Sequence, residues 1–295
     1  MASSVVMEAA SRRGVSEHHP AKFANRPGDP TFAIQMLNVR GQLLRVGRQP
    51  GSGSGVPLLM FNGIGGSIEL LEPLARSMPA REVIVFDVPG VGHSPMPRRP
   101  YRLRTLARWA EGVLDQYGHA QADVLGVSWG GAAAQEFARS ASARCRRLIL
   151  CATATGMLMV PGHPKALAKM VTPRRYMSKD HAIKISGDIY GGDFRRRPEL
   201  AADFMKHVKW QSRWGYYLQI AAATGWTSVH WLSRLKQPTL VMAGRDDPLI
   251  HTFNAKLMRL LIPNSELKVF DCGHLFLMTR PDESVRAINK FLDKP

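Results

Sequence analysis

The chain has 295 residues, 45% of them hydrophobic, and a formal net charge of +17 at pH 7. This length allows a sizeable hydrophobic core, so the fold needs no disulfide or metal to hold it together. The three cysteines show no CxxC or cysteine–histidine spacing, which argues against a disulfide framework and a structural zinc site. We expect free thiols in a reducing compartment, with no metal and no organic cofactor.

The hydrophobic residues are not arranged as in a membrane span or a secretory signal. No stretch approaches the ~18 apolar residues of a membrane span, and the first residues lack the apolar region of a secretory signal. We therefore expect a cytoplasmic protein without a transmembrane segment. Arginine clusters such as Arg195-Arg196-Arg197 supply much of the positive charge. No basic run is long or set in a nucleic-acid-binding motif, so we expect solvated charge and no nucleic-acid partner.

Residues 1–30 are rich in Ser, Arg, Pro and Gly and show no apolar period, which predicts a flexible leader. Residues 32–46 are typical of a β-hairpin that turns at Arg40-Gly41. From Pro57 onward, short apolar runs alternate with helical patterns such as Leu103–Tyr117. The runs predict buried strands: Leu58–Phe61, Val83–Phe86, Val124–Val127, Leu148–Cys151, Thr239–Ala243 and Leu267–Phe270. This alternation predicts an α/β fold, with a mostly parallel sheet between two layers of helices.

One interval interrupts the alternation. Between residues 154 and 235 no core strand is evident, and the segment is rich in methionine and aromatic residues. About 80 residues are too many for a loop. We expect a mainly helical cap over 154–235, inserted into a core formed by 31–153 and 236–295.

The sequence Gly126-Val127-Ser128-Trp129-Gly130 lies between a predicted strand and a helix over Gly131–Arg139. A Gly-x-Ser-x-Gly pattern in this context is typical of a nucleophile elbow, in which a serine occupies a sharp, strained turn. The neighbours two residues before and after it must be small, because larger side chains would collide with the strand and helix. We predict that Ser128 is a nucleophile.

A serine nucleophile needs a base, usually a histidine that a carboxylate orients. His274 follows the last predicted strand, after Gly273, and Asp246-Asp247-Pro248 follows the strand before it. The carboxyl ends of parallel strands gather at one edge of the sheet, and the chain order Ser, Asp, His is that of the α/β-hydrolase fold. We predict His274 as the base and Asp247 as its acid. Asp246 is the alternative acid, or a cap for the following helix.

Acyl transfer also needs donors for the developing oxyanion. One candidate is the backbone N–H of Trp129, which follows the nucleophile. The other is the N–H of Ile64, in the glycine-rich loop Asn62-Gly63-Ile64-Gly65-Gly66 after the first core strand. This loop lacks the spacing of a phosphate-binding loop.

Taken together, six segments resemble the intracellular depolymerases of medium-chain-length poly(3-hydroxyalkanoates). They are Asn62–Gly66, Gly126–Gly131, Tyr190–Arg195, Gly225–Leu232, Asp246–Ile250 and Gly273–Leu277. The resemblance extends over roughly residues 31–292, and the two segments in the predicted cap are its most specific part. Asn62 stands where many α/β hydrolases carry histidine, and asparagine fits the narrower group.

This resemblance implies an α/β-hydrolase fold and a catalytic triad of Ser128, Asp247 and His274. It implies a serine ester hydrolase on polyester granules in the cytoplasm, with the granule surface and granule-associated proteins as partners. The related polymer synthases carry cysteine in the elbow, so Ser128 favours hydrolysis.

Two alternatives remain open. A small-molecule carboxylesterase, lactonase or cofactor-free perhydrolase of the same fold would use the same residues. A non-catalytic granule-binding protein is the other alternative, but it would not need all three of Ser128, Asp247 and His274.

Overall fold

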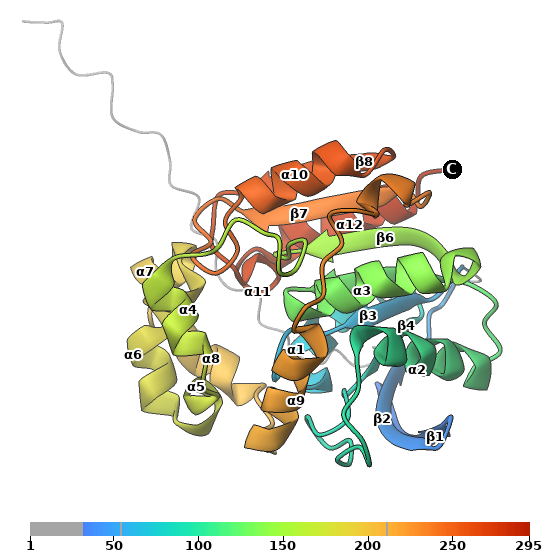
Figure 1. The fold of residues 1–295 in the computed structure, drawn as a ribbon, viewed down its shortest axis with the longest axis horizontal. Helices are drawn as coiled ribbons and strands as arrows, with labels where there is room; N and C mark the ends of the chain where they lie inside the picture. The colour runs from blue at the N-terminus through green and yellow to red at the C-terminus, as the bar shows by residue number, and fades with distance from the viewer. Residues whose placement is uncertain (1–31, 54, 211) are drawn as a thin grey trace, which may run out of the picture.

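The computed structural model describes residues 32–53, 55–210 and 212–295. Its centre is an eight-stranded sheet in the order β1-β2-β4-β3-β5-β6-β7-β8 (Figure 1). Strands β1 and β2 pair antiparallel, β2 pairs antiparallel with β4, and the remaining pairs are parallel. The strands are β1 Ala33–Val39, β2 Gln42–Gln49, β3 Leu58–Phe61, β4 Val83–Phe86, β5 Ala122–Val127, β6 Cys145–Cys151, β7 Thr239–Gly244 and β8 Ser265–Phe270. The predicted α/β class with a mostly parallel sheet is confirmed.

The strands differ in burial according to their place in the sheet. Every residue of β3, β4 and β7 is buried, and these are the apolar runs that the sequence marks most clearly. Strand β1 is an edge strand with four exposed residues at its start. Residues 1–30, predicted as a leader, lie outside the described residues.

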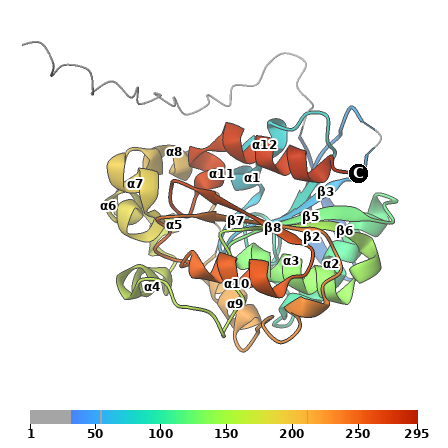
Figure 2. The same ribbon diagram turned by 90° about the horizontal axis from the view of Figure 1, so that it is seen from above.

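Helices cover both faces of the sheet (Figure 2). On one face lie α1 (Ile68–Arg76), α11 (Phe276–Thr279) and α12 (Pro281–Leu292), and their buried residues share a core with β3, β4 and β7. On the other face lie α2 (Leu103–Gln116), α3 (Trp129–Ser140) and α10 (Phe253–Leu261). Two 3₁₀ turns, Ser142–Arg144 and Leu232–Arg234, precede β6 and β7. In the part of the chain that the structure describes, no helix is long and apolar enough to cross a bilayer.

The chain between β6 and β7, residues 152–238, is here called the inserted segment. Its helices are α4 Pro164–Met170, α5 Arg174–Met177, α6 Lys179–Tyr190, α7 Gly192–Arg196, α8 Leu200–Lys206 and α9 Arg213–Ala223. Figure 1 shows α4 to α8 gathered beyond one end of the sheet. They share an apolar core of their own, which includes Tyr176, Tyr190, Phe194 and Phe204. Burial of these aromatic side chains accounts for much of the segment's unusual composition.

Candidate active site

Ser128 lies in the sharp turn between β5 and α3. Its backbone has φ 53° and ψ −118°, a conformation that a non-glycine residue adopts only at a cost in strain. The glycines on either side are required by close contacts. A Cβ on Gly126 would lie 2.4 Å from the carbonyl oxygen of Gly130, and a Cβ on Gly130 would lie 2.4 Å from that of Asn62. The turn therefore has the geometry that the Gly-x-Ser-x-Gly pattern predicts.

His274 and Asp247 meet because β7 and β8 are adjacent parallel strands. His274 Nδ1 lies 2.7 Å from Asp247 Oδ2, and both side chains are buried. The other carboxylate oxygen, Oδ1, accepts hydrogen bonds of 2.9 Å from the N–H groups of Leu249 and Ile250. Because the carboxylate is an acceptor, Nδ1 carries the proton and Nε2 is left as a base.

The alternative acid has a different environment. Asp246 Oδ2 accepts a 2.7 Å hydrogen bond from the N–H of Gly192, and its carboxylate pairs with Arg195 at 2.5 Å. Both partners belong to the inserted segment. Asp246 thus ties that segment to the sheet; within the described residues its carboxylate forms no hydrogen bond with His274, and the N-cap of the next helix is Thr252. The side chain of Asp271 is exposed, and its Oδ1 lies 3.6 Å from Arg245 Nε.

The loop after β3 approaches Ser128 from the opposite side. Gly63 N–H donates to the Asn62 side chain, Gly65 N–H to the Gln219 side chain and Gly66 N–H to the Gly63 carbonyl. For the Ile64 N–H, no acceptor is found within the described residues. The N–H of Trp129 opens helix α3, where first-turn donors lack intrahelical acceptors. These are the two groups that the sequence predicts as oxyanion donors.

Two residues of the inserted segment hold this loop, and sequence reasoning missed both. The side-chain oxygen of Gln219 accepts from Gly65 N–H at 2.7 Å, while its backbone carbonyl accepts from the Trp129 indole at 2.8 Å. The Tyr176 hydroxyl donates to the Ile64 carbonyl at 2.7 Å, which fixes the orientation of that peptide group. Nothing in the sequence distinguishes Gln219 from any other polar residue on a helix.

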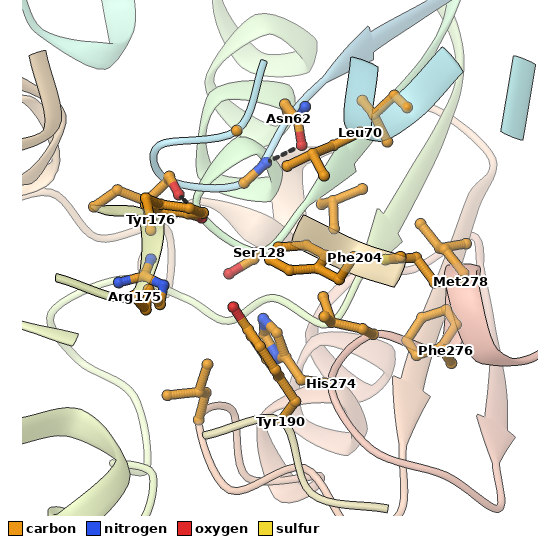
Figure 3. Close-up of a pocket in the computed structure, with 18 of the residues that line it drawn as sticks. Asn62, Leu70, Ser128, Arg175, Tyr176, Tyr190, Phe204, His274, Phe276 and Met278 are labelled. Carbon is orange, nitrogen blue, oxygen red and sulfur yellow. Dashed lines mark hydrogen bonds between the residues drawn. The ribbon is translucent and has the colours of Figure 1, made fainter. Parts of the chain in front are cut away.

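Ser128 and His274 open into one pocket, which is lined mainly by apolar side chains (Figure 3). The Tyr190 ring stacks on the His274 ring with 6.5 Å between the ring centroids. The backbone carbonyl of Tyr190 accepts a 2.7 Å hydrogen bond from the backbone N–H of His274. The apolar lining includes Leu70, Leu71, Met170, Phe204, Leu249, Phe276 and Met278. The pocket therefore suits an aliphatic group beside a reactive serine.

Comparison with known proteins assigns the chain to a family. Residues 56–281 match the alpha/beta hydrolase fold family, so the chain belongs to the alpha/beta hydrolases. Within this family, the chain is 48% identical over 264 residues to a poly(3-hydroxyalkanoate) depolymerase of Ectopseudomonas oleovorans, over 89% of this chain and 93% of that protein. This relationship makes the chain an ester hydrolase homologous to that depolymerase.

More distant relatives share the fold with other named activities. A 2-hydroxymuconate semialdehyde hydrolase of Pseudomonas putida is 29% identical over 81% of this chain and 88% of its own. The crystal structure of the enol-lactonase from Burkholderia xenovorans LB400 superposes with a TM-score of 0.76 at 22% identity, over 88% of this chain and all of that one. The latter likeness shows the fold alone.

Proposed function

We propose that the chain hydrolyses the ester bonds of poly(3-hydroxyalkanoates) with Ser128 as nucleophile, His274 as base and Asp247 as orienting acid. The observation that carries this proposal is the 2.7 Å bond from His274 Nδ1 to a buried Asp247, beside a serine on a strained turn that opens into the same pocket. The 48% identity to a poly(3-hydroxyalkanoate) depolymerase supports the substrate class.

The proposed reaction has two steps. His274 Nε2 removes the proton of Ser128 as the hydroxyl oxygen attacks the ester carbonyl, and the N–H groups of Ile64 and Trp129 bind the oxyanion. The carbon–oxygen ester bond then breaks, and the imidazolium gives its proton to the departing alcohol. Water, deprotonated by His274, hydrolyses the acyl-serine in the same manner and releases the acid.

A granule-bound polyester also requires a surface that the enzyme can dock on. The inserted segment exposes large apolar side chains, including Met177 (61%), Val171 (62%) and Trp214 (59%). Other aromatic residues of the segment, such as Tyr216 and Trp231, are buried in cores. We propose that the exposed group contacts the granule and that the basic surface assists docking on an anionic coat.

The test measures acid release from amorphous medium-chain-length polyhydroxyalkanoate granules, with a p-nitrophenyl ester in parallel. Ser128→Ala should lower turnover on both by about 10⁶-fold, as for other serine hydrolases. Ser140→Ala, at an exposed serine on the same helix, is the matched control and should retain activity. Cleavage of the soluble ester without attack on granules would move the function to small-molecule esters. Granule binding without any hydrolysis would indicate a binding protein.

A further inference from the structure

The pocket beside Ser128 contains a buried arginine that the proposed chemistry does not use. Arg175 belongs to α5, is 2% exposed and lines the pocket together with Ser128 and Tyr190. In Figure 3 the hydroxyl of Tyr190 points toward Ser128, and the guanidinium of Arg175 lies at the side of the same pocket. A buried cation in a mainly apolar pocket requires an explanation, because burial of an unpaired charge is costly.

Within the part of the chain that the structure describes, no carboxylate forms a hydrogen bond or ion pair with Arg175. Its Nη1 donates to the Tyr216 hydroxyl at 3.0 Å, and its Cζ lies 4.3 Å and 5.2 Å from the ring centres of Tyr176 and Tyr216. Among the described residues, its Nε has no hydrogen-bond partner and no ion pair forms with the side chain.

The surrounding tyrosines do not supply a counter-charge. Burial raises the pKa of Tyr190 and that of Tyr216 above the ordinary value, so both remain neutral phenols at neutral pH. Cation–π contacts and a hydroxyl group hold the guanidinium in place, but none of these neutral groups supplies a negative charge.

A substrate carboxylate would satisfy this charge. Guanidinium groups bind carboxylates by paired, charge-assisted hydrogen bonds. A poly(3-hydroxyalkanoate) chain carries one free carboxylate, at its acid end, and this group lies four bonds from the carbonyl carbon of the last ester. The interior esters of the polymer have no such group. An anion at the chain end therefore matches both the cation and its place beside the nucleophile.

We propose that Arg175 binds the terminal carboxylate of a 3-hydroxyalkanoate chain and thereby selects the last ester for cleavage. This inference rests on the proposed function. Ser128 attacks the carbonyl of that ester, the acyl–oxygen bond breaks, and the protonated His274 returns the proton to the hydroxyl oxygen of the departing monomer. Each cycle then frees one 3-hydroxyalkanoic acid and leaves an acyl-enzyme that water hydrolyses, so short acidic oligomers are good substrates.

The test compares two soluble substrates of the full-length chain: a dimer of 3-hydroxyoctanoate with a free carboxylate, and the same dimer with a terminal carboxamide. Cleavage of the central ester is followed by mass spectrometry. The wild type should show a kcat/KM about 10- to 100-fold higher for the acid, the range expected for hydrogen bonds to a charged group. Arg175→Met should remove this preference mainly by raising KM for the acid, and should change the amide little.

Arg174→Met is the matched control, since Arg174 is exposed on the same helix and its loss removes the same charge. It should keep the preference for the acid. If Arg175→Met fails to fold, the wild type still decides: octanoate should inhibit p-nitrophenyl ester hydrolysis at much lower concentration than octanamide.

The outcomes separate the two proposals. Equal cleavage of acid and amide by the wild type, with hydrolysis still dependent on Ser128, would overturn the role of Arg175 and leave the proposed function standing. Equal loss of acid and amide cleavage in a folded Arg175→Met would assign the residue a structural role. If neither dimer is cleaved in a Ser128-dependent reaction, the proposed function itself is overturned.

Discussion

The substitution Gly130→Ala probes the contact between the nucleophile turn and the loop that carries the proposed oxyanion donor. The new Cβ would lie 2.4 Å from the carbonyl oxygens of both Phe61 and Asn62, whereas ordinary contacts begin at 3.4 Å. The difference of 1.0 Å must come from movement of backbone, because neither neighbouring atom belongs to a flexible side chain. Ser128 and the Ile64 N–H would therefore move apart.

We expect two measurable consequences of this movement. Overpacking of this kind costs roughly 1–3 kcal/mol of the free energy of unfolding, measurable by urea denaturation. A 1 Å displacement of catalytic groups can lower kcat by ~10²-fold, measurable with a p-nitrophenyl ester. Gly55→Ala is the control, since a Cβ there meets nothing within 4 Å. If Gly130→Ala matched Gly55→Ala in both measurements, the close contact would not be a constraint on the site.

Three further predictions concern the groups around the site and the surface. Asp247→Asn should lower kcat on a soluble ester by about 10⁴-fold, because the amide no longer fixes the imidazole tautomer. Asp246→Asn should change kcat by less than about 10-fold. Similar losses of kcat in the two variants would contradict the assignment of the acid. Gln219→Leu leaves the buried Gly65 N–H without its acceptor, which should lower the free energy of unfolding by about 1–3 kcal/mol or disorder the oxyanion loop. We expect kcat to fall with little change in KM. An unchanged kcat and an unchanged midpoint of urea unfolding would contradict this positioning role. Although burial opposes it, hydrogen bonds from a neighbouring guanidinium and imidazole lower the pKa of Glu82 below its ordinary 4.5, so its stabilising effect is present above pH 4.5 and is lost as pH falls through the lowered value. Urea unfolding measured between pH 3 and 7 should therefore show that the free energy of unfolding falls less on acidification in Glu82→Gln than in the wild type. The same pH dependence in both proteins would refute this.

The strands of the core could be predicted closely where both faces are buried. The runs Leu58–Phe61 and Val83–Phe86 coincide with β3 and β4, because continuous apolar residues between polar segments leave little choice of boundary. Strand β8 begins at Ser265, two residues before the predicted start, because this edge strand is only partly buried and carries polar residues. Helix α3 begins at Trp129, two residues before the predicted Gly131, since glycines are tolerated in a first turn that packs closely on the sheet.

The residues of the triad could be proposed from the sequence because each follows a recognisable strand. The sequence favours Asp247 over Asp246 through the proline that follows Asp247, and in the structure Asp247 reaches His274 whereas Asp246 reaches the inserted segment. Gln219 and Arg175 could not be predicted at all. Their positions at the site depend on contacts between the inserted segment and residues far away along the chain, and helical periodicity carries no information about such contacts.

The nucleophile is the central claim, and covalent labelling by an organophosphonate ester tests it most directly. The reagent should form a single adduct on the peptide that contains Ser128, abolish ester hydrolysis, and leave Ser128→Ala unlabelled. Two results would contradict the account: an adduct on a residue other than Ser128, or full hydrolytic activity in the unlabelled Ser128→Ala variant.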